Sequence, residues 1–128
     1  HEGSLTTIHS NSPRDSLTRL ESMILMTGIN LPEQAMRFMM SSAIDILIQV
    51  SRLTDGTRRM VSLSEVVGME GEIITLQDIF RFDRRGLDAD GKVIGNFTAT
   101  GIRPKFADRI EMSGIKLPEK LFSLNVPL

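Results

Sequence analysis

Cysteine, tryptophan and tyrosine are all absent from this chain of 128 residues. The lack of thiols excludes disulfides, thiolate zinc sites and cysteine nucleophiles. Aromatic residues amount to 5% of the sequence, and all of them are phenylalanine. A chain of this length can nevertheless bury roughly two-thirds of its unfolded surface. Its hydrophobic share of 41% therefore predicts a core that needs no disulfide or metal.

A strong charge of one sign is also missing, since the formal net charge is −1. Such a balance gives no long-range field for nucleic acid or an anionic membrane. No apolar run approaches the roughly 20 residues that span a bilayer, and Asp45 and Gln49 interrupt the longest one. The first residues lack the basic and apolar regions of a signal peptide. We therefore expect a soluble protein without a transmembrane segment and without nucleic acid as a partner.

The sequence contains no recognisable phosphate-binding loop. A P-loop requires the pattern GxxxxGK[ST], in which backbone N–H groups and the lysine hold the phosphates. Gly and Lys are adjacent only at Gly91–Lys92, and Val93 follows them. The dinucleotide-binding pattern GxGxxG is absent as well. We therefore expect no nucleotide cofactor for the chain alone.

The sequence also lacks a pattern typical of a metal site or of a catalytic triad. Asp88–Gly91 begins like a calcium loop, but the further acidic ligands are missing at the required spacing, so we interpret it as a solvated turn. Ser4, His9 and Asp15 are the residue types of a catalytic triad, but no nucleophile elbow is present. The residues therefore predict neither a metal site nor a serine hydrolase.

Periodicity and capping residues predict a β-α-α segment at the start of the chain. Ser4–His9 is rich in β-forming residues and predicts a short strand. Ser12 suits the N-cap of a helix, Pro13 its first position and Gly28 its C′ position. A second helix is expected from Leu31-Pro32-Glu33 onward, with a buried face made of Met36, Met39, Met40 and Ala43.

From Ile44 onward, alternating apolar and polar residues predict strands. Asp55–Gly56 predicts a hairpin with a type I′ turn, and further turns are expected at Glu70–Gly71 and Asp90–Gly91. A helix between Pro104 and Gly114 and one last turn complete the pattern. Separate runs of helices and strands indicate α+β organisation, or the second half of a larger α/β domain.

Methionine is unusually common, with eight residues, and five of them cluster at Met23, Met26, Met36, Met39 and Met40. Methionine fills irregular gaps in cores and also forms adaptable contact surfaces. We favour the role in the core. A Met-rich docking face on the second helix is the alternative.

His9 is the residue with the most chemical potential. It is expected at the end of a strand and before a capped helix, which is where α/β sheets bind ligands. An imidazole can donate a hydrogen bond to a phosphate. A partly buried histidine with one ordinary hydrogen bond explains the same pattern. Arg52, Arg58 and Arg59 flank one turn and Arg84–Arg85 another, either as a solvated face or as phosphate ligands.

Several runs resemble secretion ATPases, in the same order along the chain. Gly3–Asp15 (GSLTTIHSNSPRD) resembles the histidine box of these ATPases and the residues that follow it. The later runs are together similar to the Tad (Flp) pilus-assembly ATPases of the CpaF/TadA type, within the type II/IV secretion ATPase superfamily: Ser41–Asp45, Arg52–Arg59, Val67–Gly71, Thr75–Phe80 and Thr100–Phe106.

The resemblance implies the C-terminal half of a RecA-like P-loop NTPase domain, followed by an antiparallel β-meander and short helices. Residues 1–67 would complete the ATPase core, and residues 68–128 would form the extension. We expect the Walker A and Walker B segments to precede this region, so the chain alone would be inactive. The parent protein would use ATP and Mg²⁺ as a homo-hexamer on the cytoplasmic side of the bacterial inner membrane.

The resemblance also implies roles for four residues. His9 would lie near the γ-phosphate and the subunit boundary as a sensor or positioning residue, with Thr7 as its strand neighbour. Arg19 and Arg52 would contact nucleotide or a neighbouring subunit. Such motors power pilin assembly or protein export and act with platform proteins of the inner membrane. The alternative function is a non-enzymatic protein-interaction module that docks through its Met-rich helix.

Overall fold

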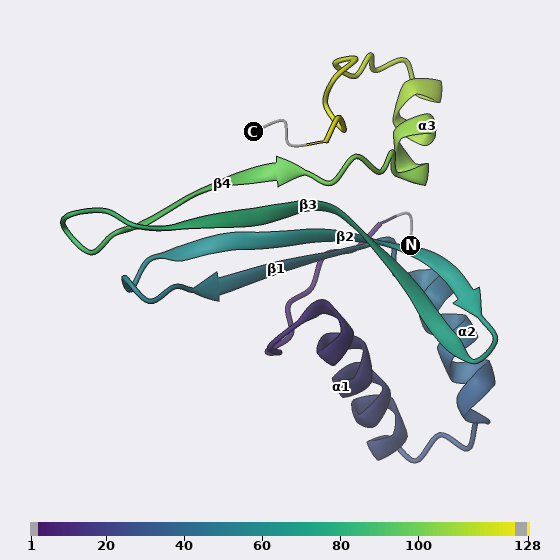
Figure 1. Cartoon of the computed structure of the whole chain (residues 1–128). Coiled ribbons are helices and arrows are strands. Elements are labelled where there is room, and N and C mark those ends of the chain that lie inside the picture. Colours follow the sequence, from purple (N-terminus) through teal and green to yellow (C-terminus); the bar gives the residue numbers. More distant parts are fainter. Residues whose placement is uncertain (1–2, 125–127) are drawn as a thin grey trace.

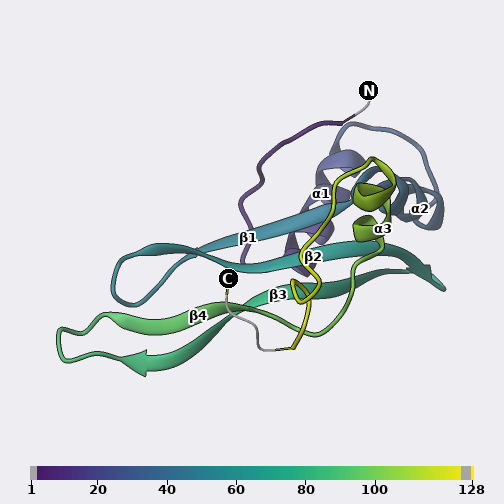
Figure 2. The same cartoon turned by 90° about the horizontal axis from the view of Figure 1, so that it is seen from above.

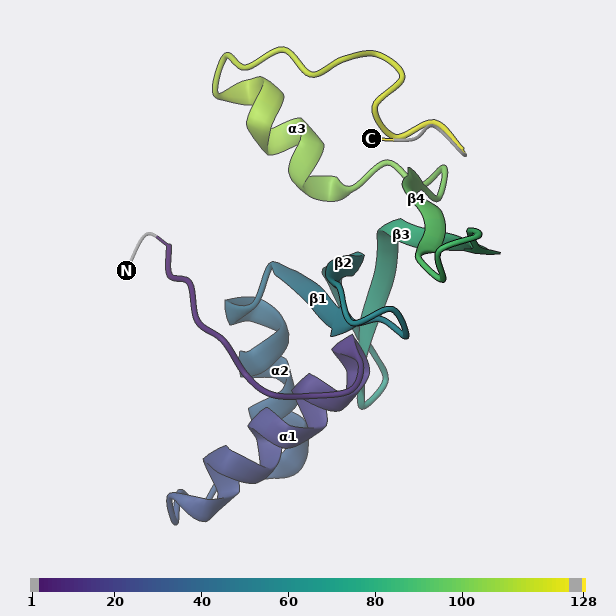
Figure 3. The same ribbon diagram turned by 90° about the vertical axis from the view of Figure 1, so that its left-hand side faces the viewer.

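The computed structural model describes residues 3–124 and 128, and its centre is a four-stranded antiparallel sheet (Figure 1). The strands follow one another as a meander, in the spatial order β1-β2-β3-β4. Of the three helices in the described residues, the first two lie on one side of the sheet and the short third one lies on the other (Figure 3). In chain order the elements are α1 (Pro13–Met26), α2 (Glu33–Ala43), β1 (Ile46–Arg52), β2 (Arg58–Glu70), β3 (Ile73–Leu87), β4 (Val93–Ala99) and α3 (Lys105–Met112). The expected α+β organisation is confirmed.

The first helix begins and ends where its capping residues predict. The Ser12 side chain accepts a hydrogen bond from the Asp15 backbone N–H at 3.0 Å. The Asp15 carboxylate in turn accepts from the Asn11 N–H at 3.1 Å. Gly28 follows the C-cap with φ +80°, a conformation that glycine adopts at no steric cost. Local chemistry therefore sets both ends of α1.

Two separate hydrophobic cores cover the two faces of the sheet. The core under α1 and α2, here called the methionine side, is built on Leu17, Met36, Met40 and Ile74. The core under α3 and the C-terminal segment, here called the phenylalanine side, is built on Ile79, Phe80, Ala99, Ala107 and Phe122. Phe80 packs against Phe97 and Phe122, with ring centroids 5.6 and 5.8 Å away.

The prediction of a strand over Ser4–His9 is wrong. This segment is extended but unpaired, and Leu5 within it is fully exposed. A strand needs a neighbour whose backbone groups complete the ladder, and the sheet edge at β1 does not pair with it in the part of the chain that the structure describes. The β-forming residues therefore favour a strand locally, but the segment has no partner strand among the described residues.

The hairpin at Asp55–Gly56 is present, but its predicted type I′ turn is wrong. Gly56 N–H donates to the Leu53 carbonyl at 2.9 Å, and Leu53 N–H donates to Thr57 at 2.7 Å. The loop therefore has three residues, Thr54–Gly56, with Gly56 at φ +83°, which is the second common hairpin geometry. The loop between β3 and β4 repeats this pattern, because Gly91 N–H donates to Asp88.

The predicted buried face of α2 is half right. Met36 and Met40 are buried, whereas Met39 is 58% exposed and Ala43 is exposed. The i, i+4 pair faces the sheet, and the helix turns the i+3 position toward solvent. Methionine therefore fills the core at two positions of the cluster and faces solvent at Met23, Met26 and Met39.

The proposed division at residues 67 and 68 falls inside β2, where Gly68 has φ +132° next to a register shift between Val66 and Gly68.

Among residues 3–124 and 128, no helix combines the length and apolarity needed to cross a bilayer.

Candidate functional site

The segment that carries Thr7 and His9 lies against the edge of the sheet. Both residues are exposed. The Gln49 side-chain amide of β1 donates to the Ser10 carbonyl at 3.1 Å, which ties the segment to the strand immediately after His9. The imidazole is therefore presented to solvent from a short extended arm rather than from a strand end.

Arg52 occupies the end of the same edge strand. It is exposed and stands three residues after Gln49, which corresponds to about 10 Å along a strand. Arg19 is exposed on α1. Within the described residues, no hydrogen bond or ion pair joins any two of the four predicted site residues. None of the four lines the hollow on α2 described below, or a second hollow lined by Arg59, Met60, Phe82, Gly95, Asn96, Phe97 and Leu128. The structure places Thr7 and His9 near β1 and leaves Arg19 on a separate element.

The described residues do not form a phosphate cradle of the P-loop kind. The helix that follows His9 in the sequence is α1, and its N-terminus is occupied by the Ser12 hydroxyl and the Asp15 carboxylate. A helix N-terminus favours anions, but here its own carboxylate fills that place. No step of ATP chemistry can be assigned to these residues alone.

Asp55, at the tip of the β1–β2 hairpin, is a carboxylate that several donors surround. Its carboxylate accepts from the Thr57 hydroxyl and N–H and, through the other oxygen, from the Val93 N–H at 2.8 Å. The Thr57 hydroxyl, followed by the Val93 N–H, holds the pKa of Asp55 well below its ordinary value. Asp55 thereby fastens the β1–β2 loop to the start of β4, at the end of the sheet where the β1–β2 and β3–β4 loops lie (Figure 2).

A second carboxylate, Glu65 of β2, is 4% exposed and joins the sheet to α3. It accepts from the backbone N–H groups of Lys105 and Phe106, each at 2.9 Å, and from the Gln77 side chain at 2.9 Å. Two unpaired N–H groups at the start of α3 thus find an acceptor from the sheet. The sequence indicated Asp55 only as a turn residue and did not indicate Glu65, although an acidic residue inside an apolar strand is a usable signal.

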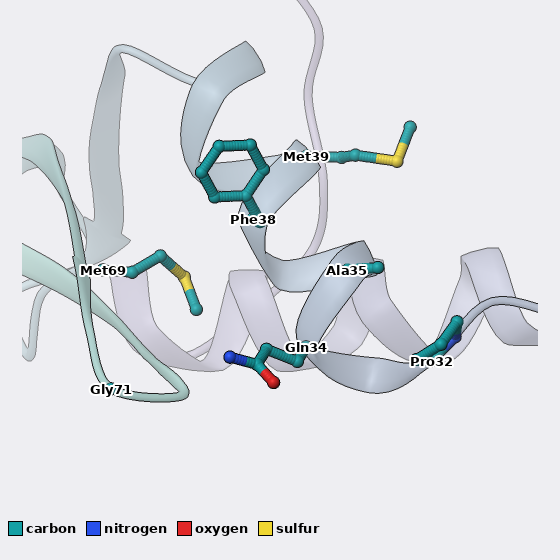
Figure 4. A pocket seen from close by; sticks show the side chains of 7 residues that line it. All are labelled: Pro32, Gln34, Ala35, Phe38, Met39, Met69 and Gly71. Atoms are coloured by element: carbon teal, nitrogen blue, oxygen red, sulfur yellow. The ribbon is translucent and has the colours of Figure 1, made fainter.

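A hollow with a volume of about 620 Å³ lies along the outer side of α2. Phe38 is 64% exposed there. In Figure 4 Phe38 lies on the side of α2 near Met69, and Met39 points away from it. The hollow is lined by Pro32, Gln34, Ala35, Phe38, Met39, Met69 and Gly71. Among residues 3–124 and 128, no group of three His, Asp or Glu side chains is arranged to hold a metal ion.

No family model matches the sequence. Two proteins of Mycobacterium tuberculosis, from strains CDC 1551 / Oshkosh and ATCC 25618 / H37Rv, are similar to it and are provisionally named conjugal transfer proteins. Each is 27% identical over 73 residues, which is 57% of this chain and 20% of the relative. The matched part is thus about a fifth of the relatives' length. The chain is therefore similar, over this part, to proteins named for conjugal transfer.

Proposed function

We propose that this chain is the C-terminal part of a secretion-type ATPase of the Tad (Flp) pilus-assembly kind. The carrying observation is that the runs resembling this family keep their order over nearly the whole chain. Similarity to proteins named for conjugal transfer supports a secretion-related setting. In this proposal the residues 1–67 complete a RecA-like core and the residues 68–128 form its extension.

In the proposed motor, His9 is a γ-phosphate sensor or positioning residue at the subunit boundary, and Thr7 supports it. The exposed arm held by Gln49 suits this role, because an imidazole at the surface can reach a ligand held by another part of the protein. Arg52 and Arg19 would contact nucleotide or a neighbouring subunit. Phosphoryl transfer depends on positioning and charge stabilisation, and the P-loop segment would hold ATP and Mg²⁺.

The proposed assembly is a homo-hexamer on the cytoplasmic side of the bacterial inner membrane, working with platform proteins to assemble pilin or export protein. Two experiments test the proposal. The chain alone should show no ATP turnover and weak or no magnesium-dependent ATP binding, and steady turnover would contradict it. The gene should encode GxxxxGK[ST] upstream of His1, and a reading frame without this motif would contradict it equally.

A second candidate function is a non-enzymatic interaction module. The exposed Phe38 and Met39 beside the hollow on α2 favour it, because exposed aromatic and methionine side chains are typical of contact surfaces. Phe38→Ser in the intact protein separates the candidates. If this variant loses both ATP turnover and the native assembly, the motor is favoured. If it loses a binding partner and the intact protein has no ATPase activity, the interaction module is favoured.

A further inference from the structure

Three exposed arginines lie on one face of the sheet, at the end where the β1–β2 and β3–β4 loops lie. They are Arg52, Arg58 and Arg84, here called the tip arginines. Arg52 and Arg58 are directly opposite each other in the β1–β2 ladder. Side chains two residues apart in a strand share a face, so Arg84 lies on the same side as Phe80. Ile48, Leu63 and Phe80 are cross-strand partners, which puts Arg52 and Arg58 on that side as well.

Two of these guanidinium groups, those of Arg52 and Arg84, border one loop. Arg84 Nη2 is 3.5 Å from the Thr54 hydroxyl, although 30 residues separate them in sequence. Arg52 Nη2 is 3.9 Å from the position that a Cβ on Gly56 would occupy. Both groups therefore border the Thr54–Gly56 loop. The Asp55 contact to Val93 fastens this loop to the neighbouring hairpin, so three strands hold the tip arginines in a preset arrangement.

Three acidic residues near the tip arginines have other partners. Asp55 uses both oxygens in the loop contacts, Asp83 pairs with Arg85 at 2.8 Å, and Asp88 accepts from the Asp90 and Lys92 N–H groups. Among the described residues no ion pair includes a tip arginine, whereas five other arginines have carboxylate partners: Arg37, Arg81, Arg85, Arg103 and Arg109.

Like charges directly opposite in a ladder destabilise a sheet, and a shared anion removes that repulsion. A guanidinium presents a rigid fork of N–H donors that matches phosphate oxygens. Three forks from three strands suit a tetrahedral, multiply charged group better than a planar carboxylate, which has two oxygens and one charge.

We propose that the tip arginines form a binding site for a phosphate-bearing anion. The site extends beyond the proposed ATPase role, because it involves Arg58 and Arg84 and needs no P-loop or Mg²⁺. Two sources supply this chemistry: a soluble polyphosphate, or the headgroups of an anionic phospholipid surface. The exposed Val50–Met60 pair next to Arg52 and Arg58 on the same face would contact such a surface.

The test is calorimetric titration of this chain with inorganic tripolyphosphate at low salt, with EDTA to remove Mg²⁺. Arg58→Gln and Arg84→Gln should each weaken binding about three- to tenfold, as expected for loss of a charge-assisted hydrogen bond at an exposed site. Arg85→Gln removes the same charge from the same hairpin and should change binding less than about twofold, because Arg85 already pairs with Asp83. Equal weakening by all three variants would show that binding depends on net charge alone, and it would overturn the proposal.

Co-sedimentation with vesicles separates the two sources. Retention on phosphatidylglycerol vesicles but not on phosphatidylcholine vesicles, lost in Arg58→Gln and Arg84→Gln, assigns the headgroup. Tripolyphosphate binding without vesicle retention assigns a soluble ligand. Absence of both, with the variants folded by circular dichroism, overturns the proposal. ATP turnover is not measured, so that result leaves the proposed ATPase role standing.

Discussion

The two sides of the sheet achieve burial by different means. The methionine side uses two regular helices of 14 and 11 residues, whose apolar positions recur at helical spacing. The phenylalanine side uses one helix of 8 residues and an irregular segment. Such a short helix is marginal in water by itself, so aromatic rings and the buried Glu65 carboxylate hold it in place.

This difference predicts unequal tolerance to change. Methionine has three rotatable bonds and adapts to altered surroundings, whereas stacked phenylalanine rings have a fixed geometry. A lost contact on the phenylalanine side also releases an element with little stability of its own. We therefore expect that side to be the more sensitive of the two.

The largest effect is expected for Phe80→Ala. Phe80 is buried between two other rings, and truncation of such a side chain costs about 3–5 kcal/mol of unfolding free energy. Urea denaturation followed by circular dichroism measures it. Phe38→Ala is the matched control, because Phe38 is exposed, and it should change stability by less than about 0.5 kcal/mol. Similar losses for both variants would contradict the assignment of the core.

Glu65→Ala is expected to have the next largest effect. It leaves the Lys105 and Phe106 N–H groups without their acceptor, at a cost of about 2–3 kcal/mol. Amide hydrogen exchange at the start of α3 should accelerate more than exchange in α1. Glu70→Ala, at an exposed position of the same strand, is the control. Unchanged protection of α3 would show that the carboxylate does not hold the helix.

Met36→Leu compares the plasticity of the two cores. Met36 is buried on the methionine side, and a swap that conserves volume should cost less than about 1.5 kcal/mol. Phe80→Leu should cost more, because it opens the contacts between rings. The two variants are compared by their urea midpoints. A larger loss for Met36→Leu would reverse the ranking of the two sides.

The smallest effect at neutral pH is expected for Asp55→Asn, and its signature is a pH dependence. The pKa of Asp55 is lower in the folded chain than its ordinary value, which is near 3.9 for an unfolded aspartate. Its stabilising effect is therefore complete above about pH 4 and is lost as the pH falls toward the folded pKa. Urea midpoints between pH 7 and pH 3 should fall less steeply for the variant.

Thr57→Val removes the donor with the largest influence on the Asp55 pKa and should flatten the acid part of the profile in the same direction. If wild type and both variants lose stability in parallel between pH 4 and pH 3, Asp55 does not fasten the hairpin loops.

Elements governed by neighbouring residues could be predicted from the sequence. Ser12, Pro13 and Gly28 set the ends of α1 through contacts within a few residues, and the meander follows from alternation and glycine turns. The wrong details also have a local cause. Alternation cannot tell a two-residue loop from the three-residue loop at Thr54–Gly56, and a β-rich run such as Ser4–His9 contains no information about a missing partner.

Contacts between residues far apart in the sequence could not be predicted, because neighbouring residues do not specify them. Asp55 meets Val93 across 38 residues, and Glu65 meets Lys105 across 40. Nothing in either local sequence specifies the other partner. Exposure of Met39 beside buried Met36 and Met40 likewise depends on how α2 is rotated over the sheet. The roles of His9, Thr7, Arg19 and Arg52 stay predictions from resemblance.

Steady-state ATP hydrolysis by the intact protein, wild type against His9→Ala, tests the proposed motor most directly. His9 is exposed, so its removal should leave the urea midpoint unchanged. Loss of a residue that positions or senses the γ-phosphate should nevertheless reduce kcat by about tenfold or more. A variant that hydrolyses ATP at the wild-type rate, or an intact protein without ATPase activity, would contradict the proposal.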